Sequence, residues 1–310
     1  MNDARSSTAT ATTATAEPTP TLIGRFAPSP TGPLHLGSLV AATGSYLDAR
    51  HQGGRWLVRL EDLDTPRNLA GAEAAILQTL AAFGFSTDGA VVRQSKRRAL
   101  YESALSLLWQ RGLLFRCRCS RREIAEAGLS DEPRCVGDCR RHLQAEGEGC
   151  LRVALDSLPP RQVHDRSGRE IRFDPTVHTD VVVRRRDRVI AYHLAVVVDD
   201  AEQAVSDVVR GGDLLGSATW QLGLQSALSL PTPRYLHLPL VVEPDGTKLA
   251  KSRHSVPLAT GAAPFLLRRA LQLLGQPSPK VAASDLEATW QSAIAAWDPA
   301  AASRCAEVPA

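Results

Sequence analysis

The 310-residue sequence has no apolar run long enough to span a bilayer, because arginine, aspartate, glutamine or histidine interrupts every apolar stretch. Its first twenty residues also lack the apolar block of a secretory signal, and Arg5 is their only basic residue. We therefore expect residues 1–20 to form a disordered tail, with a transit peptide as the less favoured alternative, since so few apolar side chains cannot offset the entropy of ordering a backbone. A cytoplasmic chain without a membrane partner is expected, with its six cysteines reduced.

The charges of the sequence are almost balanced, giving a formal net charge of +3. This small basic excess is compatible with a polyanionic partner and too small to demonstrate one. The sequence has no internal repeat, and its length suits one or two domains with insertions.

The order of the apolar runs predicts an α/β fold with a parallel sheet. Residues 22–26 are predicted to form a buried strand, which leads into a turn rich in proline and glycine at 27–33. Apolar residues then recur at helical spacing over 36–51, and 56–60 is predicted to be a second strand. Strand, turn, helix and strand together make a βαβ unit.

Later segments extend this pattern around an insertion. Further helices are predicted at 72–83, 96–110, 263–274 and 284–297. Residues 192–198 and 204–209 have the apolar texture of covered parallel strands, and 234–239 is predicted to be another strand. Between these halves, 117–139 is expected to be irregular, and 151–190 to hold the short strands of a small mixed subdomain.

A first motif suited to nucleotide chemistry lies where the first strand meets the first helix, in Pro28-Ser-Pro-Thr-Gly-Pro-Leu-His-Leu-Gly-Ser38. Gly37 lets a flat purine or a phosphate approach the backbone where a Cβ would clash. The helix that follows turns its unpaired N–H groups toward that ligand. His35 can donate a hydrogen bond to a phosphoryl oxygen that gains charge, although a capping histidine in a turn is an alternative interpretation.

A second motif, Thr247-Lys-Leu-Ala-Lys-Ser252, follows the turn Glu243-Pro-Asp-Gly246. Lysines in a mobile loop that starts with glycine are suited to clamp a pyrophosphate leaving group when the loop closes. A pair of solvated lysines is the alternative interpretation.

Together the two motifs resemble the split signature of class I aminoacyl-tRNA synthetases, written H-I-G-H and K-M-S-K-S in that family. Ser38 stands in place of the second histidine, while Leu249 and Ala250 stand in place of methionine and serine. The resemblance implies a Rossmann-type nucleotide-binding fold that uses ATP with Mg²⁺, and catalytic roles for His35 and Lys251. The ATP-binding residues that it implies are His35, Gly37, Ser38, Lys248 and Lys251.

The charge pattern of the remaining motifs suits an acidic amino acid. Free glutamate carries two carboxylates and one ammonium, so its pocket needs cationic or N–H donors and one anion. Arg25 and Arg210 can supply the donors, Glu61 the anion and Tyr192 a hydroxyl, although surface ion pairs look the same in a sequence.

Four segments, which begin at Gly24, Arg59, Ala191 and Val209, look like the glutamyl and glutaminyl branch of class I. They read Gly-Arg-Phe-Ala-Pro-Ser-Pro, Arg-Leu-Glu-Asp-Leu-Asp, Ala-Tyr-His-Leu-Ala and Val-Arg-Gly-Gly-Asp. The glutamate-binding residues implied by this resemblance are Arg25, Phe26, Ala27, Pro28, Ser29, Glu61, Tyr192 and Arg210.

Four cysteines form two close pairs across a short polar loop, Cys117 with Cys119 and Cys135 with Cys139. Four thiolates in this arrangement match a tetrahedral structural zinc site, with free thiols as the alternative. The arginines around the loop can contact RNA phosphates or form a solvated, ion-paired face. They are Arg116, Arg118, Arg121, Arg122, Arg140 and Arg141.

The short chain and the cysteine loop resemble the glutamyl-queuosine tRNA(Asp) synthetases. Members of that family activate glutamate without tRNA and transfer it to the queuosine base at the wobble position of tRNA(Asp). We expect a disordered tail, two catalytic halves, a zinc-containing insertion of acceptor type and a short helical C-terminal segment, as a monomer without an anticodon-binding domain. The tail is expected at 1–20, the catalytic halves at 21–115 and 191–252, the insertion at 116–190 and the C-terminal segment at 253–310.

Two other functions fit the same residues. A truncated glutamyl-tRNA synthetase would charge the acceptor end of tRNA(Glu) instead. A noncatalytic zinc-containing RNA-binding module would show no glutamate-dependent pyrophosphate exchange.

Overall fold

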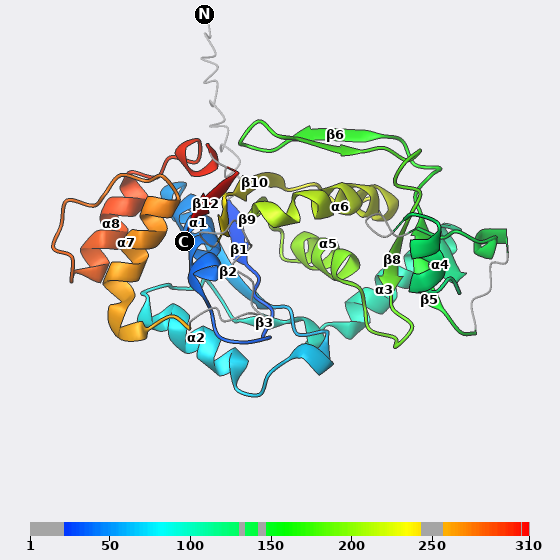
Figure 1. The fold of residues 1–310 in the computed structure, drawn as a ribbon, viewed down its shortest axis with the longest axis horizontal. Coiled ribbons are helices and arrows are strands. Elements are labelled where there is room, and N and C mark those ends of the chain that lie inside the picture. The colour runs from blue at the N-terminus through cyan, green and yellow to red at the C-terminus, as the bar shows by residue number, and fades with distance from the viewer. Residues whose placement is uncertain (1–21, 130–133, 142–146, 243–256, 305, 310) are drawn as a thin grey trace, which may run out of the picture.

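The chain folds into an elongated molecule with a parallel sheet near its middle (Figure 1). The computed structural model describes residues 22–129, 134–141, 147–242, 257–304 and 306–309. The expected tail and the loop with Lys248 and Lys251 lie outside the described residues. Helices α7 and α8 form one end of the molecule, and a small sheet with α4 forms the other.

The helices and strands of the described part have the following bounds. The α-helices are α1 (Leu36–His51), α2 (Ala72–Ala82), α3 (Arg98–Gln110), α4 (Arg121–Glu126), α5 (Tyr192–Glu202), α6 (Leu215–Leu228), α7 (Ala263–Leu273) and α8 (Leu286–Ala295). The strands are β1 (Ile23–Phe26), β2 (Arg55–Leu60), β3 (Val92–Arg93), β4 (Leu114–Cys117), β5 (Cys150–Ala154), β6 (Arg161–His164), β7 (Glu170–Phe173), β8 (Asp180–Arg184), β9 (Asp207–Gly211), β10 (Arg234–Leu238), β11 (Leu240–Val242) and β12 (Glu307–Pro309). Short 3₁₀ turns lie at Thr65–Arg67, Gln94–Lys96, Cys139–Arg141, Gly212–Leu214, Thr260–Ala262 and Ala301–Ser303.

The predicted βαβ unit is present, with β1 and β2 parallel and α1 between them in the chain. Strand β3 pairs with β2, and β9 pairs with β10, all in parallel. The two halves meet at Ile23, whose carbonyl accepts from Ser206 N over 3.0 Å just before β9 begins. Helix α1 packs on both β1 and β9. Buried Leu47 and Trp56 anchor this core, each stabilising it by about 1.5–3 kcal/mol.

Residues 192–198 were predicted to be a strand, and this prediction is wrong, because they lie in α5. The helix is buried on most sides, since it packs against α3 and α6. A continuous apolar run is typical both of a parallel strand and of a buried helix, so its texture alone does not separate the two. Residues 117–139 were expected to be irregular, but α4 forms there on a capping box between Ser120 and Glu123.

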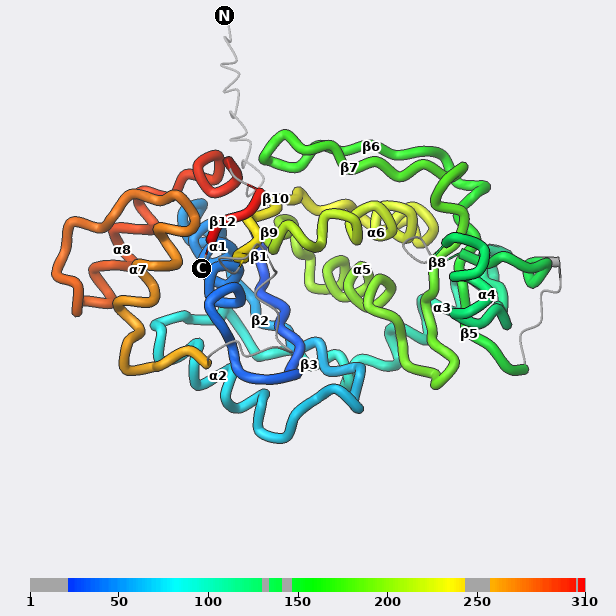
Figure 2. The backbone as a smooth tube through the Cα atoms, in the orientation of Figure 1, coloured from blue at the N-terminus to red at the C-terminus, as the bar shows by residue number. Residues whose placement is uncertain are grey.

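The insertion holds the short strands that the sequence predicted. Strands β4, β5 and β8 form an antiparallel sheet, and β6 and β7 form a separate hairpin. The hairpin runs along α6 toward β10 (Figure 2). A Cβ at Gly223 of α6 would lie 2.9 Å from the Phe173 ring, so a glycine is needed for this close approach.

The predicted C-terminal helices are present as α7 and α8, which pack on α1. Trp290 and Trp297 of this region are buried, and their indole N–H groups donate to Phe83 O and Asp48 Oδ1. Within the described ranges, none of the helices combines the length and the apolar character needed to cross a membrane.

Candidate active site

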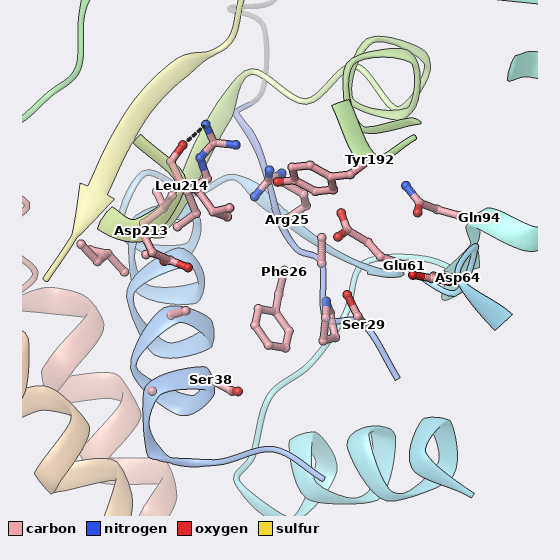
Figure 3. Close-up of a pocket in the computed structure, with 18 of the residues that line it drawn as sticks. Arg25, Phe26, Ser29, Ser38, Glu61, Asp64, Gln94, Tyr192, Asp213 and Leu214 are labelled. Atoms are coloured by element: carbon pink, nitrogen blue, oxygen red, sulfur yellow. Dashed lines mark hydrogen bonds between the residues drawn. The ribbon is translucent and has the colours of Figure 1, made fainter. Parts of the chain in front are cut away.

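A cavity of about 750 Å³ opens at the carboxyl ends of β1 and β9, beside the N-terminal ends of α1 and α5 (Figure 3). In open α/β sheets this edge is where ligands bind. The cavity brings together every residue predicted for glutamate and the three described residues predicted for ATP. These are Arg25, Phe26, Ala27, Pro28, Ser29, His35, Gly37, Ser38, Glu61, Tyr192 and Arg210.

His35 caps the N-terminal end of α1 at the cavity wall. Its Nδ1 accepts a hydrogen bond from Ser38 N over 3.3 Å. An accepting Nδ1 carries no proton, so the neutral ring has its proton on Nε2. A Cβ at Gly37 would lie 3.1 Å from His35 Cε1 and would press on the ring. His35 therefore caps the helix, as the alternative interpretation expects, and its ring can still donate a hydrogen bond from Nε2.

Arg25 is buried beneath the cavity and is fixed by a carboxylate of α5. Its Nε donates to Asp200 Oδ1 over 3.3 Å, and the buried Arg59 contacts the same oxygen through Nη2 at 2.8 Å. Burial would raise the pKa of Asp200, but the charges of Arg25 and Arg59 outweigh it and lower that pKa. Arg59 also contacts Asp199 at 3.7 Å and Glu61 at 4.0 Å, so several carboxylates share these two buried arginines.

Arg210 reaches the cavity from β9 and is 4% exposed. Its Nη1 donates to Gln221 Oε1 over 2.9 Å, and its Nη2 donates to Leu214 O over 3.2 Å, the dashed line in Figure 3. Its Nε donates to His237 Nε2 over 3.2 Å. Among the residues that the structure describes, no carboxylate lies within ion-pair distance of this guanidinium, so neutral acceptors alone hold a buried cation.

Glu61 and Tyr192 point into the cavity near Arg25 (Figure 3). Burial raises the pKa of Glu61 to about 7, even though the charges of Arg59 and Arg25 lower it. Burial and the neighbouring Glu61 carboxylate also raise the pKa of Tyr192, which keeps its hydroxyl protonated. The cavity thus holds one carboxylate that titrates near neutrality and one hydroxyl donor.

Several site residues were missed by the sequence analysis. Asp64 bridges two sides of the cavity, since its Oδ2 contacts Arg67 Nε at 2.5 Å and Arg185 Nη1 at 3.0 Å. Asp64 ends the segment that begins at Arg59 and resembles the family motif, so its position in that motif indicates a site residue. Arg185 lies in a run of arginines with no local sign of a site, and Asp200 is recognisable only through its contacts.

The four predicted cysteines converge at the far end of the insertion. The Sγ atoms of Cys117, Cys119, Cys135 and Cys139 all lie within 4.8 Å of one another. Cys119 Sγ is 3.8 Å from Cys135 Sγ and 3.9 Å from Cys139 Sγ. Four sulfurs bound tetrahedrally at about 2.3 Å from zinc would lie about 3.8 Å apart. The cluster can therefore hold a metal ion.

Comparisons with known proteins agree with this architecture. Residues 21–283 match the family model described as tRNA synthetases class I (E and Q), catalytic domain. The chain is 48% identical to the glutamyl-Q tRNA(Asp) synthetase of Pseudomonas fluorescens, over 91% of this chain and 92% of that protein. It is 46% identical to the protein of the same name from Pseudomonas aeruginosa, over 94% and 98% of the two chains.

The fold also matches a solved structure. A glutamate tRNA ligase from Elizabethkingia meningosepticum, in complex with its amino acid, superposes with a TM-score of 0.74 at 23% identity. The match covers 93% of this chain but only 66% of that ligase, so the likeness concerns the shared fold. The chain has the class I synthetase catalytic fold and belongs to the glutamyl and glutaminyl branch of that class, within the glutamyl-Q tRNA(Asp) synthetase family.

Proposed function

We propose that this enzyme activates glutamate with ATP in the absence of tRNA and then transfers the glutamyl group to the queuosine base at the wobble position of tRNA(Asp). The observation that carries the proposal is Arg210, a buried cation with neutral acceptors that shares one cavity with Arg25 and Glu61. Such a set suits a small molecule with two carboxylates and one ammonium.

A single orientation is proposed for glutamate in the cavity, with its side chain toward Arg25 and its α-carboxylate toward α1. Arg25 and Arg210 receive the side-chain carboxylate, Glu61 pairs with the ammonium and Tyr192 adds a hydroxyl contact. Figure 3 shows Ser38 well apart from Arg25 and Tyr192. The α-carboxylate then faces the N-terminal end of α1, where ATP phosphates are favoured by the helix dipole.

The first step needs no protein nucleophile. An oxygen of the α-carboxylate attacks the α-phosphorus of ATP, and pyrophosphate leaves. His35 donates from Nε2 to the phosphate oxygens as they gain charge, with Gly37 and Ser38 at the same helix end. Lys248 and Lys251, outside the described residues, are proposed to hold the pyrophosphate. Mg²⁺ accompanies ATP, and catalysis rests on positioning and charge stabilisation.

In the second step a queuosine hydroxyl attacks the glutamyl carbonyl carbon, its proton is lost and AMP leaves. RNA is read most often at exposed bases in loops, and a wobble base is such a base.

Support for an RNA partner comes from arginines at one end of the β4–β5–β8 sheet. The charges of Arg184, Arg188 and Arg118 add to burial and lower the pKa of Arg116. Arg186, which borders a smaller cavity with Arg118, lies next to Arg185 of the main cavity. Phosphates would relieve this crowding of like charges. Arg122 pairs with Glu126 and Arg140 with Asp156, so these two fit the ion-paired alternative, and Arg184 of the crowded group also contacts Glu102 at 3.5 Å.

The insertion at 116–190 is proposed to carry this RNA-binding surface and a structural zinc ion, between catalytic halves at 21–115 and 191–252. Cys117, Cys119, Cys135 and Cys139 would ligate the ion as thiolates. A small separate core of Phe115, Cys117 and Cys150 supports a distinct unit around the cluster. Zinc would fix the polar loop against this sheet.

A transfer assay with three tRNAs tests the proposed function. We expect labelled glutamate to be transferred to tRNA(Asp) that contains queuosine, and no transfer to tRNA(Asp) that lacks it or to tRNA(Glu). Glutamate-dependent exchange of pyrophosphate into ATP is expected without any tRNA. Equal transfer to both forms of tRNA(Asp) would overturn the assigned acceptor, and charging of tRNA(Glu) would establish the truncated synthetase instead. A chain without exchange activity would be a noncatalytic module.

The titration of Glu61 gives a pH dependence for glutamate affinity. Only the ionised carboxylate can pair with the ammonium, so KM for glutamate should rise about tenfold per pH unit below a pH near 7. Steady-state exchange at several pH values measures this. Glu61→Gln should raise KM and flatten its pH profile. The exposed Glu170 of β7 provides the control Glu170→Gln, which should keep the wild-type profile. A Glu61→Gln profile parallel to that of the wild type would contradict the assignment.

A further inference from the structure

Behind the cavity, Arg210 is held by a chain of hydrogen bonds that ends in the β6–β7 hairpin. Arg210 of β9 and His237 of β10 are register partners, so their side chains are neighbours. Arg210 Nε donates to His237 Nε2 over 3.2 Å, and His237 Nδ1 lies 2.9 Å from Asp165 Oδ2. All three residues are buried.

The partners of His237 determine where its proton lies. The arginine Nε can only donate, so His237 Nε2 accepts and the proton of the ring sits on Nδ1, from which it is donated to Asp165. Burial lowers the pKa of His237 and outweighs the bond to Asp165, which raises it. The ring is therefore neutral, and it orients the Arg210 cation without cancelling its charge.

Asp165 itself is fixed by the turn that follows β6. Its Oδ1 accepts from Ser167 N at 2.9 Å and from Arg169 N at 3.0 Å, while its Oδ2 accepts from both Nδ1 and the backbone N of His237, at 2.9 and 3.3 Å. The turn is also attached to the catalytic sheet, since Arg166 N donates to Tyr235 O over 2.8 Å. A hairpin of the insertion is thereby joined to the inner wall of the cavity.

We propose that Asp165 and His237 are positioning residues for Arg210, through which the β6–β7 hairpin sets the affinity for the substrate carboxylate. The inference rests on the proposed function, in which Arg210 binds a carboxylate of glutamate. His237 is not among the residues that line the cavity, so it acts through Arg210. A carboxylate placed directly on Arg210 would compete with the substrate, whereas a neutral ring between Asp165 and Arg210 separates the two charges.

Asp165→Asn tests the relay with little change in volume. The asparagine oxygen stays with the two turn N–H groups, so its amide N–H₂ takes the place of Oδ2, faces His237 Nδ1 and no longer accepts from the backbone N of His237. His237 must then accept at Nδ1 and carry its proton on Nε2, which opposes the Arg210 Nε–H. We expect KM and Kd for glutamate to rise about tenfold or more, because a bond to a charged group is lost, with KM for ATP and kcat nearly unchanged.

Two variants of His237 complete the test. His237→Gln offers an oxygen to Arg210 and an amide N–H to Asp165, so it should restore most of the affinity that His237→Leu loses. The exposed His164 of the same hairpin gives the control His164→Gln, which should behave as wild type. Equal glutamate affinity in wild type, Asp165→Asn and His237→Leu would overturn the proposal.

A spectroscopic measurement separates this inference from the proposed function. ¹⁵N NMR of the imidazoles, with His237→Gln to assign the signal, should show the Nδ1–H tautomer in the wild type and the Nε2–H tautomer in Asp165→Asn. The same tautomer in both proteins would exclude the relay whatever the substrate is. Calorimetry of glutamate binding to the wild type gives the second readout. A changed tautomer without any glutamate binding would show that Asp165 and His237 support Arg210. In that case the proposed function and the role of the relay in glutamate affinity would both be wrong.

Discussion

Replacing Arg210 by methionine should reduce glutamate-dependent pyrophosphate exchange at low glutamate by about 30-fold or more, since losing one side of a buried charged pair costs about 2–5 kcal/mol. Methionine keeps much of the length of the side chain, so the cavity wall should survive. The loss should appear in KM for glutamate, because Arg210 is proposed to contact the bound amino acid and not the ATP phosphates. Steady-state exchange with each substrate varied in turn measures it.

Two further substitutions make this result specific. Arg210→Lys keeps the charge but not the planar fork, so it should recover only part of the affinity. Arg234 begins β10, is itself exposed and pairs with the buried Asp207, which Arg166 also contacts, so Arg234→Met is the control that should leave KM unchanged. A fall in ATP affinity equal to the fall in glutamate affinity would show that Arg210 supports the cavity as a whole and does not select the amino acid.

Removing one ligand of the cysteine cluster should separate the two steps of the reaction. We expect the Cys135→Ser variant not to retain zinc, because structural zinc sites depend on all four ligands. The free energy of zinc binding contributes to folding, and it is about 10–16 kcal/mol in small zinc peptides. Glutamyl transfer to tRNA should then fall by at least about tenfold, whereas pyrophosphate exchange should persist, because the cluster core is separate from the cavity.

Metal analysis and the two activity assays decide this prediction. Cys305→Ser is the control, since this cysteine was placed outside the predicted set of ligands, and it should retain zinc and transfer. Hydrogen exchange should show faster exchange in β4 and α4 of Cys135→Ser and unchanged rates in β1 and β9. Wild-type protein purified without zinc, or parallel loss of exchange and transfer in Cys135→Ser, would contradict the proposed role.

Local patterns predicted much of the fold. The helices near residues 36–51 and 263–274 carry periodic apolar residues, and the structure places α1 and α7 there. The failure at residues 192–198 has a physical cause, because their apolar run is short and nearly continuous, which suits a buried strand as well as a buried helix.

The sequence predicted those site residues whose charge complements a charge of glutamate. Arg25, Glu61 and Arg210 follow from the charges of glutamate together with the family motifs. Asp165 and His237 do not, because their value depends on a contact between residues 72 positions apart in the sequence. In the sequence both Arg25 and Arg210 are arginines near the ends of predicted strands. Only the structure shows that Arg210 donates to neutral acceptors, whereas Arg25 donates to a carboxylate.

The join between β1 and the segment before β9 has a consequence for synthesis on the ribosome. Ile23 N donates to Ser206 Oγ across 183 positions of sequence, so one side of β1 has no neighbour until most of the chain has been made. At about 5–20 residues per second, that interval lasts roughly ten to forty seconds. During it the nascent chain presents the backbone edge of an apolar strand, which favours association between chains. Slower initiation or a chaperone that covers this edge should therefore raise the yield of soluble enzyme.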